Sequence, residues 1–251
     1  MSEEKQTIAD LITLLLTKHP EYHQAIEEWI DRYRLQRAKN GRYVGLNELD
    51  RKLEKYIGFD SGYFVELGAN DGISQSNTFY YETHRRWRGV LIEPVLHNYF
   101  KCIANRAVET KVFCNACVSF DYKDPFVELF YSNLMSVSTG LSSDVNEPKA
   151  HADIGRQFLK GSEHPVGFGA KAAPLSELLQ LAESPRIIDF LSLDVEGAER
   201  EVLAGIDHDR YRFRYMCIES RNRPLLDEFL SQYNYFLIEQ LSEHDYLYAD
   251  R

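Results

Sequence analysis

The fold is decided by residues 63–72, which read YFVELGANDG. Residues 63–67 form a short apolar run, and the small and turn-forming residues after it predict a buried strand that ends in a tight turn. A helix is expected to begin soon after the turn, near residues 75–78. This order of strand, turn and helix is typical of a βα unit, in which ligands bind beyond the carboxyl end of the strand.

The rest of the chain repeats this pattern of short apolar runs followed by helical stretches, which indicates a mainly parallel sheet. Six further main strands are expected at residues 89–93, 111–118, 187–194, 215–219, 235–239 and 246–249. Residues 127–131 are a candidate side strand. The sequence therefore predicts one α/β domain with seven main strands, from residue 58 to residue 251.

A helical extension is expected before this domain, at residues 1–57. Its apolar residues follow the helical period, as in Tyr22, Ile26, Trp29, Ile30 and Tyr33. We expect the extension to cap a substrate site, to form a homodimer with a second subunit, or simply to pack against the sheet. Residues 132–172, rich in Ser, Gly, Pro and His, show no sustained period, which predicts an insertion that is either a substrate lid or a surface loop.

Size and charge limit the classes of function. A chain of 251 residues, 44% of them hydrophobic, can close the core of one ordinary α/β domain. Its net charge of -10 disfavours a nucleic-acid partner, because a phosphate backbone needs clustered Lys and Arg, so we expect a small or neutral substrate. Near the start no apolar run is long enough to span a bilayer, and four cysteines are few for a disulfide framework. We therefore expect a cytoplasmic protein without a membrane span.

The turn at residues 66–72 suits a polar ligand. Its glycines let the backbone turn sharply and let a ligand approach main-chain N–H groups closely. The spacing of Gly68 and Gly72 lacks the third small residue of the dinucleotide fingerprint, and the acids Glu66 and Asp71 would repel phosphates. S-adenosylmethionine carries a sulfonium and an ammonium group and no phosphate. The turn therefore favours this cofactor over a dinucleotide.

Acids at the ends of two later strands extend the expected site. Glu93 lies 25 residues after Gly68, where an open α/β sheet places a carboxylate for ribose hydroxyls, and Pro94 then stops the strand. The alternative is a Glu that starts a helix with Pro in its first turn. Asp194 ends the strand expected at residues 187–194, so it should project into the same crevice. There it can orient the cofactor, deprotonate a hydroxyl or hold a metal.

A divalent metal is a further candidate ligand at the same edge. Glu219 ends the next expected strand, and Asn222 follows it closely. With Asp194 they offer three hard oxygen donors that can converge on one cation. His208 and His244 are further candidate bases, although a lone histidine near a loop is more often a polar surface residue.

These residues resemble the FkbM-type methyltransferases. The motifs that carry the resemblance are residues 64–72 (FVELGANDG), 76–78 (SNT), 92–94 (IEP) and 193–199 (LDVEGAE). In the last motif, Glu196 and Glu199 also suit the first turn of a helix. The resemblance spans residues 62–249 and implies a class I methyltransferase (Rossmann-like) fold, with a seven-stranded, mainly parallel sheet whose last strand is antiparallel. It also implies methyl transfer to a hydroxyl oxygen, often on a sugar, glycan or other small-molecule acceptor, with S-adenosylhomocysteine as product.

The resemblance also implies where the cofactor lies. Residues 66–72 would surround its methionine part, Glu93 its ribose, and Asn115 and Ala116 its adenine. We expect cofactor contacts from Glu66, Gly68, Ala69, Asn70, Asp71, Gly72, Ser76, Asn77, Glu93, Pro94, Asn115, Ala116 and Asp194. Asp194 is also the expected catalytic residue, acting directly or through a metal.

Two other classes of protein stay open at this point. In the first, the sheet binds the cofactor without turnover, and the helical extension mediates assembly. The second is a nicotinamide-dependent oxidoreductase, against which the acidic turn and the missing third small residue argue.

Overall fold

The computed structural model describes residues 43–132, 137–138, 141 and 165–251. The expectations for residues 1–42 and for most of the insertion at 132–172 lie outside the described residues. In chain order the helices and strands are η2 (Leu46–Glu48), α3 (Leu49–Ile57), β1 (Tyr63–Leu67), α4 (Phe79–Arg85), β2 (Arg88–Ile92), α5 (Leu96–Asn105), β3 (Lys111–Phe113), β4 (Ala116–Cys117), β5 (Phe126–Tyr131), β6 (Val137–Ser138), β7 (Val166–Ala173), α7 (Leu175–Leu181), β8 (Ile187–Leu193), α8 (Glu199–Leu203), β9 (Arg212–Glu219), α9 (Arg223–Ser231), β10 (Tyr235–Gln240) and β11 (Asp245–Asp250).

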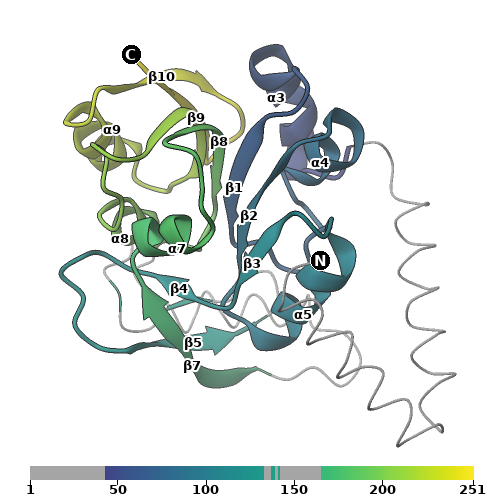
Figure 1. The fold of residues 1–251 in the computed structure, drawn as a ribbon. Helices are drawn as coiled ribbons and strands as arrows, with labels where there is room; N and C mark the ends of the chain where they lie inside the picture. The colour runs from purple at the N-terminus through teal and green to yellow at the C-terminus, as the bar shows by residue number, and fades with distance from the viewer. Residues whose placement is uncertain (1–42, 133–136, 139–140, 142–164) are drawn as a thin grey trace, which may run out of the picture.

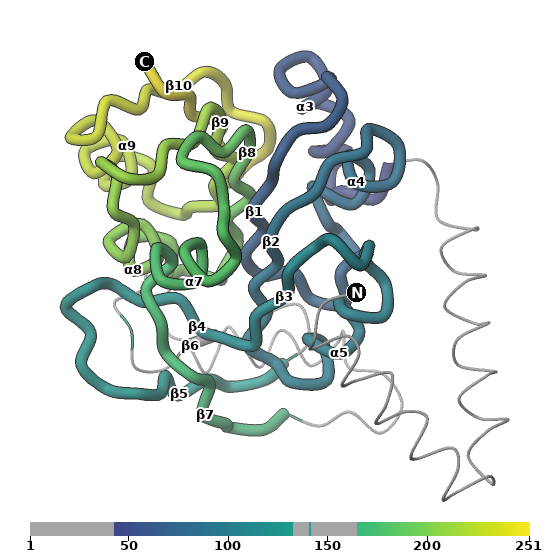
Figure 2. Tube along the Cα trace, viewed as in Figure 1, coloured from purple at the N-terminus to yellow at the C-terminus, as the bar shows by residue number. Residues whose placement is uncertain are grey.

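Seven strands form one sheet in the order β10-β11-β9-β8-β1-β2-β3 (Figures 1 and 2). β11 is antiparallel to both of its neighbours, and the other neighbouring strands pair in parallel. The predicted class I methyltransferase fold, with seven strands and an antiparallel last strand, is thus confirmed. β1 lies between β2 and β8, so the direction in which strands are added reverses at β1. Such a reversal opens a ligand crevice beyond the carboxyl end of the strand.

Two layers of helices cover the sheet. In β1, Phe64 packs with Leu53 of α3 and Tyr81 of α4, whereas Val65 packs with Leu179 of α7 on the other face. Figure 1 shows α7, α8 and α9 on one side of the sheet and α3, α4 and α5 on the other. Both faces are therefore buried, as a mainly parallel sheet requires.

A second, four-stranded sheet has the order β4-β7-β5-β6. It corrects the expectation of one strand at residues 111–118. β3 ends at Phe113, and β4 leaves the main sheet to pair with β7. An unbroken apolar run does not reveal the bend at Cys114 and Asn115, which is why the single strand was wrong. The side strand expected at residues 127–131 is confirmed as β5, which pairs with β6 and β7.

β7 lies almost entirely within residues 132–172, where the sequence shows no sustained period. Its eight residues read VGFGAKAA and pair with β5 along most of their length. Gly and Ala have low strand propensity, so this segment shows no strand pattern in the sequence. A strand is therefore formed here because β5 and β4 offer partners, not because of local preference.

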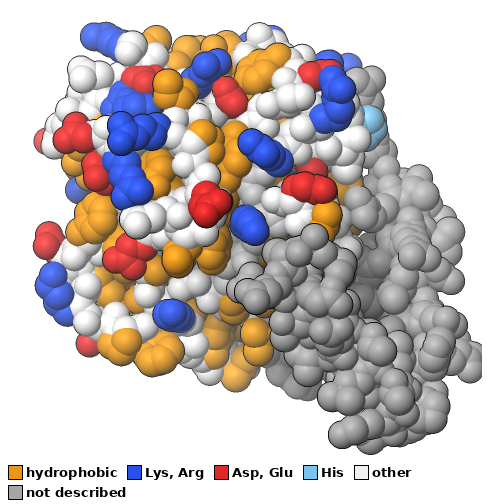
Figure 3. Space-filling view, in the orientation of Figure 1, with side chains coloured by type: hydrophobic (Ala, Val, Ile, Leu, Met, Phe, Trp, Pro, Cys, Tyr) orange, Lys and Arg blue, Asp and Glu red, His pale blue; other side chains and the backbone are white. Residues whose placement is uncertain are grey.

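The exterior is mixed in character. On the face shown in Figure 3, Lys and Arg side chains lie among acidic and hydrophobic ones. A helix needs about 20 apolar residues to cross a bilayer. Among the helices of the described ranges, none has that combination of length and apolar character.

Candidate active site

A cavity of about 470 Å³ lies beyond the carboxyl ends of β1, β2 and β8, between the main sheet and the small one. Its volume is in the range of sites for cofactors and small molecules. Most of the expected cofactor residues line it, namely Glu66, Gly68, Asn70, Ser76, Asn77, Glu93, Pro94, Asn115, Ala116 and Asp194. Leu129 and Phe168 of the small sheet add an apolar wall. The structure thus brings together residues that lie far apart in the sequence.

The turn after β1 depends on glycine at residue 68. Gly68 has φ +76°, and a Cβ atom there would lie 1.9 Å from the carbonyl oxygen of Asp194. The N–H groups of Gly68 and Ala69 donate to the carbonyl of Ile92 over 3.2 and 3.3 Å. Only glycine therefore lets the turn touch the chain after β8 while it stays bonded to β2.

Three expected cofactor residues lie outside the cavity lining and shape the turn instead. Ala69 is almost fully buried. Gly72 has φ +80°, which favours glycine. The Oδ1 atom of Asp71 accepts hydrogen bonds from the N–H groups of Ile73 (2.9 Å) and Ser74 (2.7 Å). The carboxylate of Asp71 therefore fixes the backbone that leads toward α4.

Glu66, at 4% exposed, is the acceptor that fixes the segment before α4. Its carboxylate accepts hydrogen bonds from Ser76 Oγ (2.8 Å), the N–H of Asn77 (2.8 Å) and Thr78 Oγ1 (2.6 Å). α4 begins at Phe79, directly after these residues and slightly later than expected. Glu66 lines the cavity, and its carboxylate mainly holds Ser76 and Asn77 in position at the cavity wall.

Arg106, just after α5, completes this network and was not found from the sequence. Its fully buried guanidinium donates to Glu66 Oε2 (3.4 Å), to Glu82 Oε2 (3.1 Å) and to the carbonyl of Gly72 (3.0 Å). It also donates to Thr78 Oγ1 over 2.8 Å. One side chain thereby ties the turn after β1 to the start of α4.

Glu93 lies at the carboxyl end of β2, as expected. One carboxylate oxygen accepts from the N–H of Asn70 and the other from the N–H of Val95, each over 2.8 Å. Burial raises the pKa of Glu93 to about 7, and these two hydrogen bonds oppose the rise. Each oxygen has a second lone pair that can accept a hydrogen bond from a ligand in the cavity.

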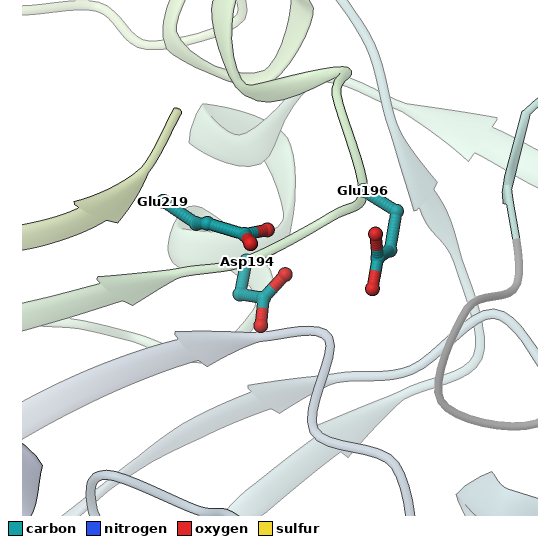
Figure 4. A group of neighbouring side chains, drawn as sticks. All are labelled: Asp194, Glu196 and Glu219. Atoms are coloured by element: carbon teal, nitrogen blue, oxygen red, sulfur yellow. The ribbon is translucent and has the colours of Figure 1, made fainter. Parts of the chain in front are cut away.

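Three acids meet at the ends of β8 and β9 (Figure 4). Carboxylate oxygens of Asp194, Glu196 and Glu219 lie within 4.8 Å of one another. Arg221 contacts two of them, through Nη2, at 3.2 Å from Glu196 and 3.7 Å from Glu219. The expected ligand Asn222 is used elsewhere, because its side chain caps α9 by accepting from the N–H of Leu225 over 3.4 Å. Glu196 is therefore the third acid of the group, and three hard oxygen donors of this kind can hold a divalent cation.

The surroundings of these acids oppose their negative charge. The side chain of Asp194 is open to the cavity, but protein surrounds that space. Desolvation therefore raises the pKa of Asp194 well above its usual range, and the charges of Glu219 and Glu196 raise it further. Burial, with the charge of Glu196, raises the pKa of Glu219 to about 7. A carboxyl group with a pKa near 7, like that of Glu219, can exchange protons with a reacting group near neutral pH.

Two residues that line the cavity each have one acceptor atom that is closed to solvent and has no hydrogen-bond donor among the described residues. These atoms are Oδ1 of Asn77 and Oε2 of Glu219. The other end of the Asn77 amide is fixed, because Nδ2 donates to Ser192 Oγ over 3.0 Å. An unsatisfied buried acceptor costs free energy, but these two atoms have almost no accessible surface and do not face the cavity as the side chains stand. The acids Glu93 and Asp194, which line the cavity, suit a ligand with N–H and O–H donors.

The two histidines considered as bases lie outside the cavity lining. His244 is at the surface, with Nε2 at 3.8 Å from Glu243. His208 is buried, and its ring stacks on Tyr233 with the centroids 3.9 Å apart. Its Nε2 atom lies 3.3 Å from the carbonyl oxygen of Leu203. Neither histidine is placed to act on a ligand in the cavity.

His208 gives a prediction for stability instead. Burial lowers its pKa to about 4, below about 6.5 in the unfolded chain. The unfolded state therefore binds more protons between these values, and the free energy of unfolding falls as the pH falls from about 6.5 to 4, by up to about 3 kcal/mol. Urea unfolding of the wild type and of His208→Phe should show a stability difference that changes across this pH window. His244→Phe is the control, and an equal pH slope in the wild type and His208→Phe would contradict the assignment.

Comparisons with known proteins gave a family match and several similar structures. The family model of the methyltransferase FkbM domain matches residues 66–248. Among solved structures, that of M. capricolum TrmK in complex with its natural cofactor product S-adenosyl-homocysteine matches with a TM-score of 0.38 and 10% identity, over 80% of this chain and 65% of that one. A human methyltransferase 10 domain containing protein matches with a TM-score of 0.34 and 11% identity, over 79% of this chain and 78% of its own. No curated protein matches the sequence.

Proposed function

The chain belongs to the FkbM methyltransferase family, and from that premise we propose that it transfers the methyl group of S-adenosylmethionine to a hydroxyl oxygen of a sugar, a glycan or another small-molecule acceptor. The observation that carries this proposal is the position of Asp194. Asp194 directly follows β8 and lines the cavity, and its backbone carbonyl lies against the turn at Gly68. A basic group is needed there if the acceptor is an alcohol, because an alcohol is a poor nucleophile.

The donor set of the cavity suits this cofactor. S-adenosylmethionine carries an ammonium group, ribose hydroxyls and an adenine amine, all of which donate hydrogen bonds. The cavity offers acceptors at Glu93 and Asp194, and its acids also favour a positive charge. A pyrophosphate would meet those same acids, which argues against the nicotinamide alternative.

We assign the expected cofactor residues to three roles. Those proposed to contact the cofactor are Gly68, Asn70, Ser76, Asn77, Glu93, Pro94, Asn115, Ala116 and Asp194, which all line the cavity. Glu66 lines it too and is proposed to act mainly by positioning Ser76 and Asn77. Ala69, Asp71 and Gly72 are proposed to set the shape of the turn. The cofactor would thus be held by backbone and acceptor groups that the fold has already fixed.

The reaction requires alignment and removal of a proton. When bound, S-adenosylmethionine supplies a methyl carbon activated by its positively charged sulfur. The walls of the cavity would hold the acceptor oxygen in line with that carbon and exclude water. A carboxylate oxygen of Asp194 would take the hydroxyl proton as the new C–O bond forms and the C–S bond breaks, which leaves S-adenosylhomocysteine. A cation held by Asp194, Glu196 and Glu219 is the alternative means of lowering the pKa of the hydroxyl.

The test of this function is a transfer assay read by mass spectrometry. The protein is incubated with S-adenosylmethionine labelled in its methyl group and with separate sets of sugars, oligosaccharides and small alcohols. We expect a labelled methyl group on an oxygen of one acceptor class, with one S-adenosylhomocysteine released for each transfer. Label on nitrogen or sulfur acceptors would refute the hydroxyl assignment. Tight cofactor binding without transfer to any acceptor would favour the non-catalytic module.

Glu93→Ala tests the cofactor site without an acceptor. Loss of a charge-assisted hydrogen bond should weaken binding of S-adenosylmethionine by about 1.5–3 kcal/mol, or about 10- to 150-fold in Kd. Isothermal titration calorimetry measures this change, and thermal unfolding shows whether the variant is folded. Glu109→Ala removes an exposed acid outside the cavity lining and serves as the matched control. Wild-type affinity in Glu93→Ala would defeat the assignment of Glu93.

A further inference from the structure

α5 exposes an apolar stripe. The stripe consists of Leu96, Phe100, Ile103 and Ala104, which share one face of the helix because they lie at positions i, i+4, i+7 and i+8. Leu96 is 59% exposed and Phe100 is 48% exposed. Apolar residues that line up on one face of a surface helix are expected to face a packing partner.

The opposite face of α5 is polar, and it is the buried one. Asn98, Cys102 and Asn105 are each at most 3% exposed. Asn105 Nδ2 donates to the carbonyl of Asp71 over 2.8 Å, and Cys102 Sγ donates to the carbonyl of Asn70 over 3.0 Å. This helix thus uses its polar face to hold the turn after β1 and leaves its apolar stripe outward. The usual packing of an amphipathic helix on a sheet does not explain the stripe.

We propose that residues 22–33 of the same chain pack on the α5 stripe. This segment lies outside the described residues, and the proposal uses only its sequence. Its apolar residues are Tyr22, Ile26, Trp29, Ile30 and Tyr33. Their spacing of i, i+4, i+7, i+8 and i+11 predicts a helix with an apolar stripe of the same period as that of α5. Two such stripes can interlock along helices of similar length, because 12 residues span about 18 Å and the 10 residues of α5 about 15 Å.

The connection to the described chain allows this packing. Nine residues, 34–42, separate the segment from Tyr43, and they can span up to about 30 Å. The described chain begins near the turn that α5 holds, because Gly45 forms a bridge with Gln75, three residues after Gly72. The segment and the α5 stripe are therefore within reach of each other in one molecule. Such packing would brace α5 and, through Asn105, the turn at Asp71, whatever reaction the protein catalyses.

Photocrosslinking in the full-length chain tests this proposal. Benzoylphenylalanine replaces Phe100 in one protein and Phe120 in the control, because Phe120 is also 48% exposed and lies outside α5. After irradiation of the purified protein, mass spectrometry identifies the linked peptides. We expect position 100, and not position 120, to link to residues 22–33 within one chain. Links from position 100 to another segment, or covalent dimers that form in its place, would overturn the proposal.

Tryptophan fluorescence gives an independent readout. Trp87 is buried, so an exposed change on α5 should alter the emission of Trp29 alone. We expect Phe100→Asp to shift the emission to longer wavelength by exposing Trp29, and Phe120→Asp to leave it unchanged. The shift should not depend on protein concentration. Equal spectra of the two variants, or a shift seen only at concentrations where the chain dimerises, would contradict packing within one molecule.

Discussion

Arg106→Met is expected to lower the free energy of unfolding by about 3–5 kcal/mol, because it removes one partner of a buried ion pair and leaves the other charge unpaired. The side chains of Glu66 and Glu82 would then stay buried with less compensation for their charge. Their side chains are at most 5% exposed, so water cannot replace the lost guanidinium. Urea unfolding at neutral pH measures the change.

The same substitution should also weaken the cofactor site. Arg106 donates to the carbonyl of Gly72 and to Thr78 Oγ1, and through Glu66 it supports Ser76 and Asn77. Methionine fills similar space but offers no donor, so the turn would lose its tie to the start of α4. Arg106→Lys should have a smaller effect, because one ammonium group keeps the charge but cannot reach all of these acceptors. Calorimetry with S-adenosylmethionine at a temperature where the variants stay folded reports this part of the effect.

Arg51→Met is the matched control for Arg106. Arg51 also pairs with an acid, Glu48, at 3.1 Å, but both side chains are more than 60% exposed. Pairs of this kind contribute about 0–1 kcal/mol, so the control should unfold almost as the wild type does. A loss below 1 kcal/mol in Arg106→Met would show that the buried network does not stabilise the fold.

The main sheet was predictable because its strands are buried on both faces. Such strands are short apolar runs, and the runs at residues 63–67 and 187–194 match β1 and β8 closely. The small sheet was only partly predictable. β5 carries large apolar side chains, whereas β7 is rich in Gly and Ala and forms through pairing with β5. β7 becomes a strand through its pairing with another segment, and its own sequence shows no strand pattern.

The residues of the candidate site also fall into predictable and unpredictable ones. Glu93 and Asp194 were predictable because the end of a strand fixes each position. Arg106 had no signal, because its contact with Glu66 joins residues 40 apart in the sequence. The role of Asn222 did have a sequence signal, since Asn before Arg-Pro is typical of a helix N-cap. Its side chain caps α9 in the structure. Glu196 joins the acids because it lies before α8, at φ 55°, in the turn that ends β8.

Asp194→Asn is expected to reduce the turnover number by about 10²–10⁴, the contribution of a positioned general base. The amide has nearly the same shape but cannot accept the acceptor's proton. The backbone contacts of this residue should survive, because the N–H of Asp194 donates to the carbonyl of Leu67 and its own carbonyl lies against Gly68. Cofactor affinity should therefore change far less than turnover.

Single-turnover assays with labelled cofactor and calorimetry separate the two effects of Asp194→Asn. Glu243→Gln changes an exposed acid away from the cavity lining and should keep wild-type turnover. Chelation then distinguishes the two roles proposed for Asp194. If the carboxylate acts directly, wild-type turnover survives removal of divalent cations, whereas a cation held with Glu196 and Glu219 would make it fall and return on adding magnesium. Turnover of Asp194→Asn equal to that of the wild type would exclude Asp194 as the general base, because an amide cannot take up the proton.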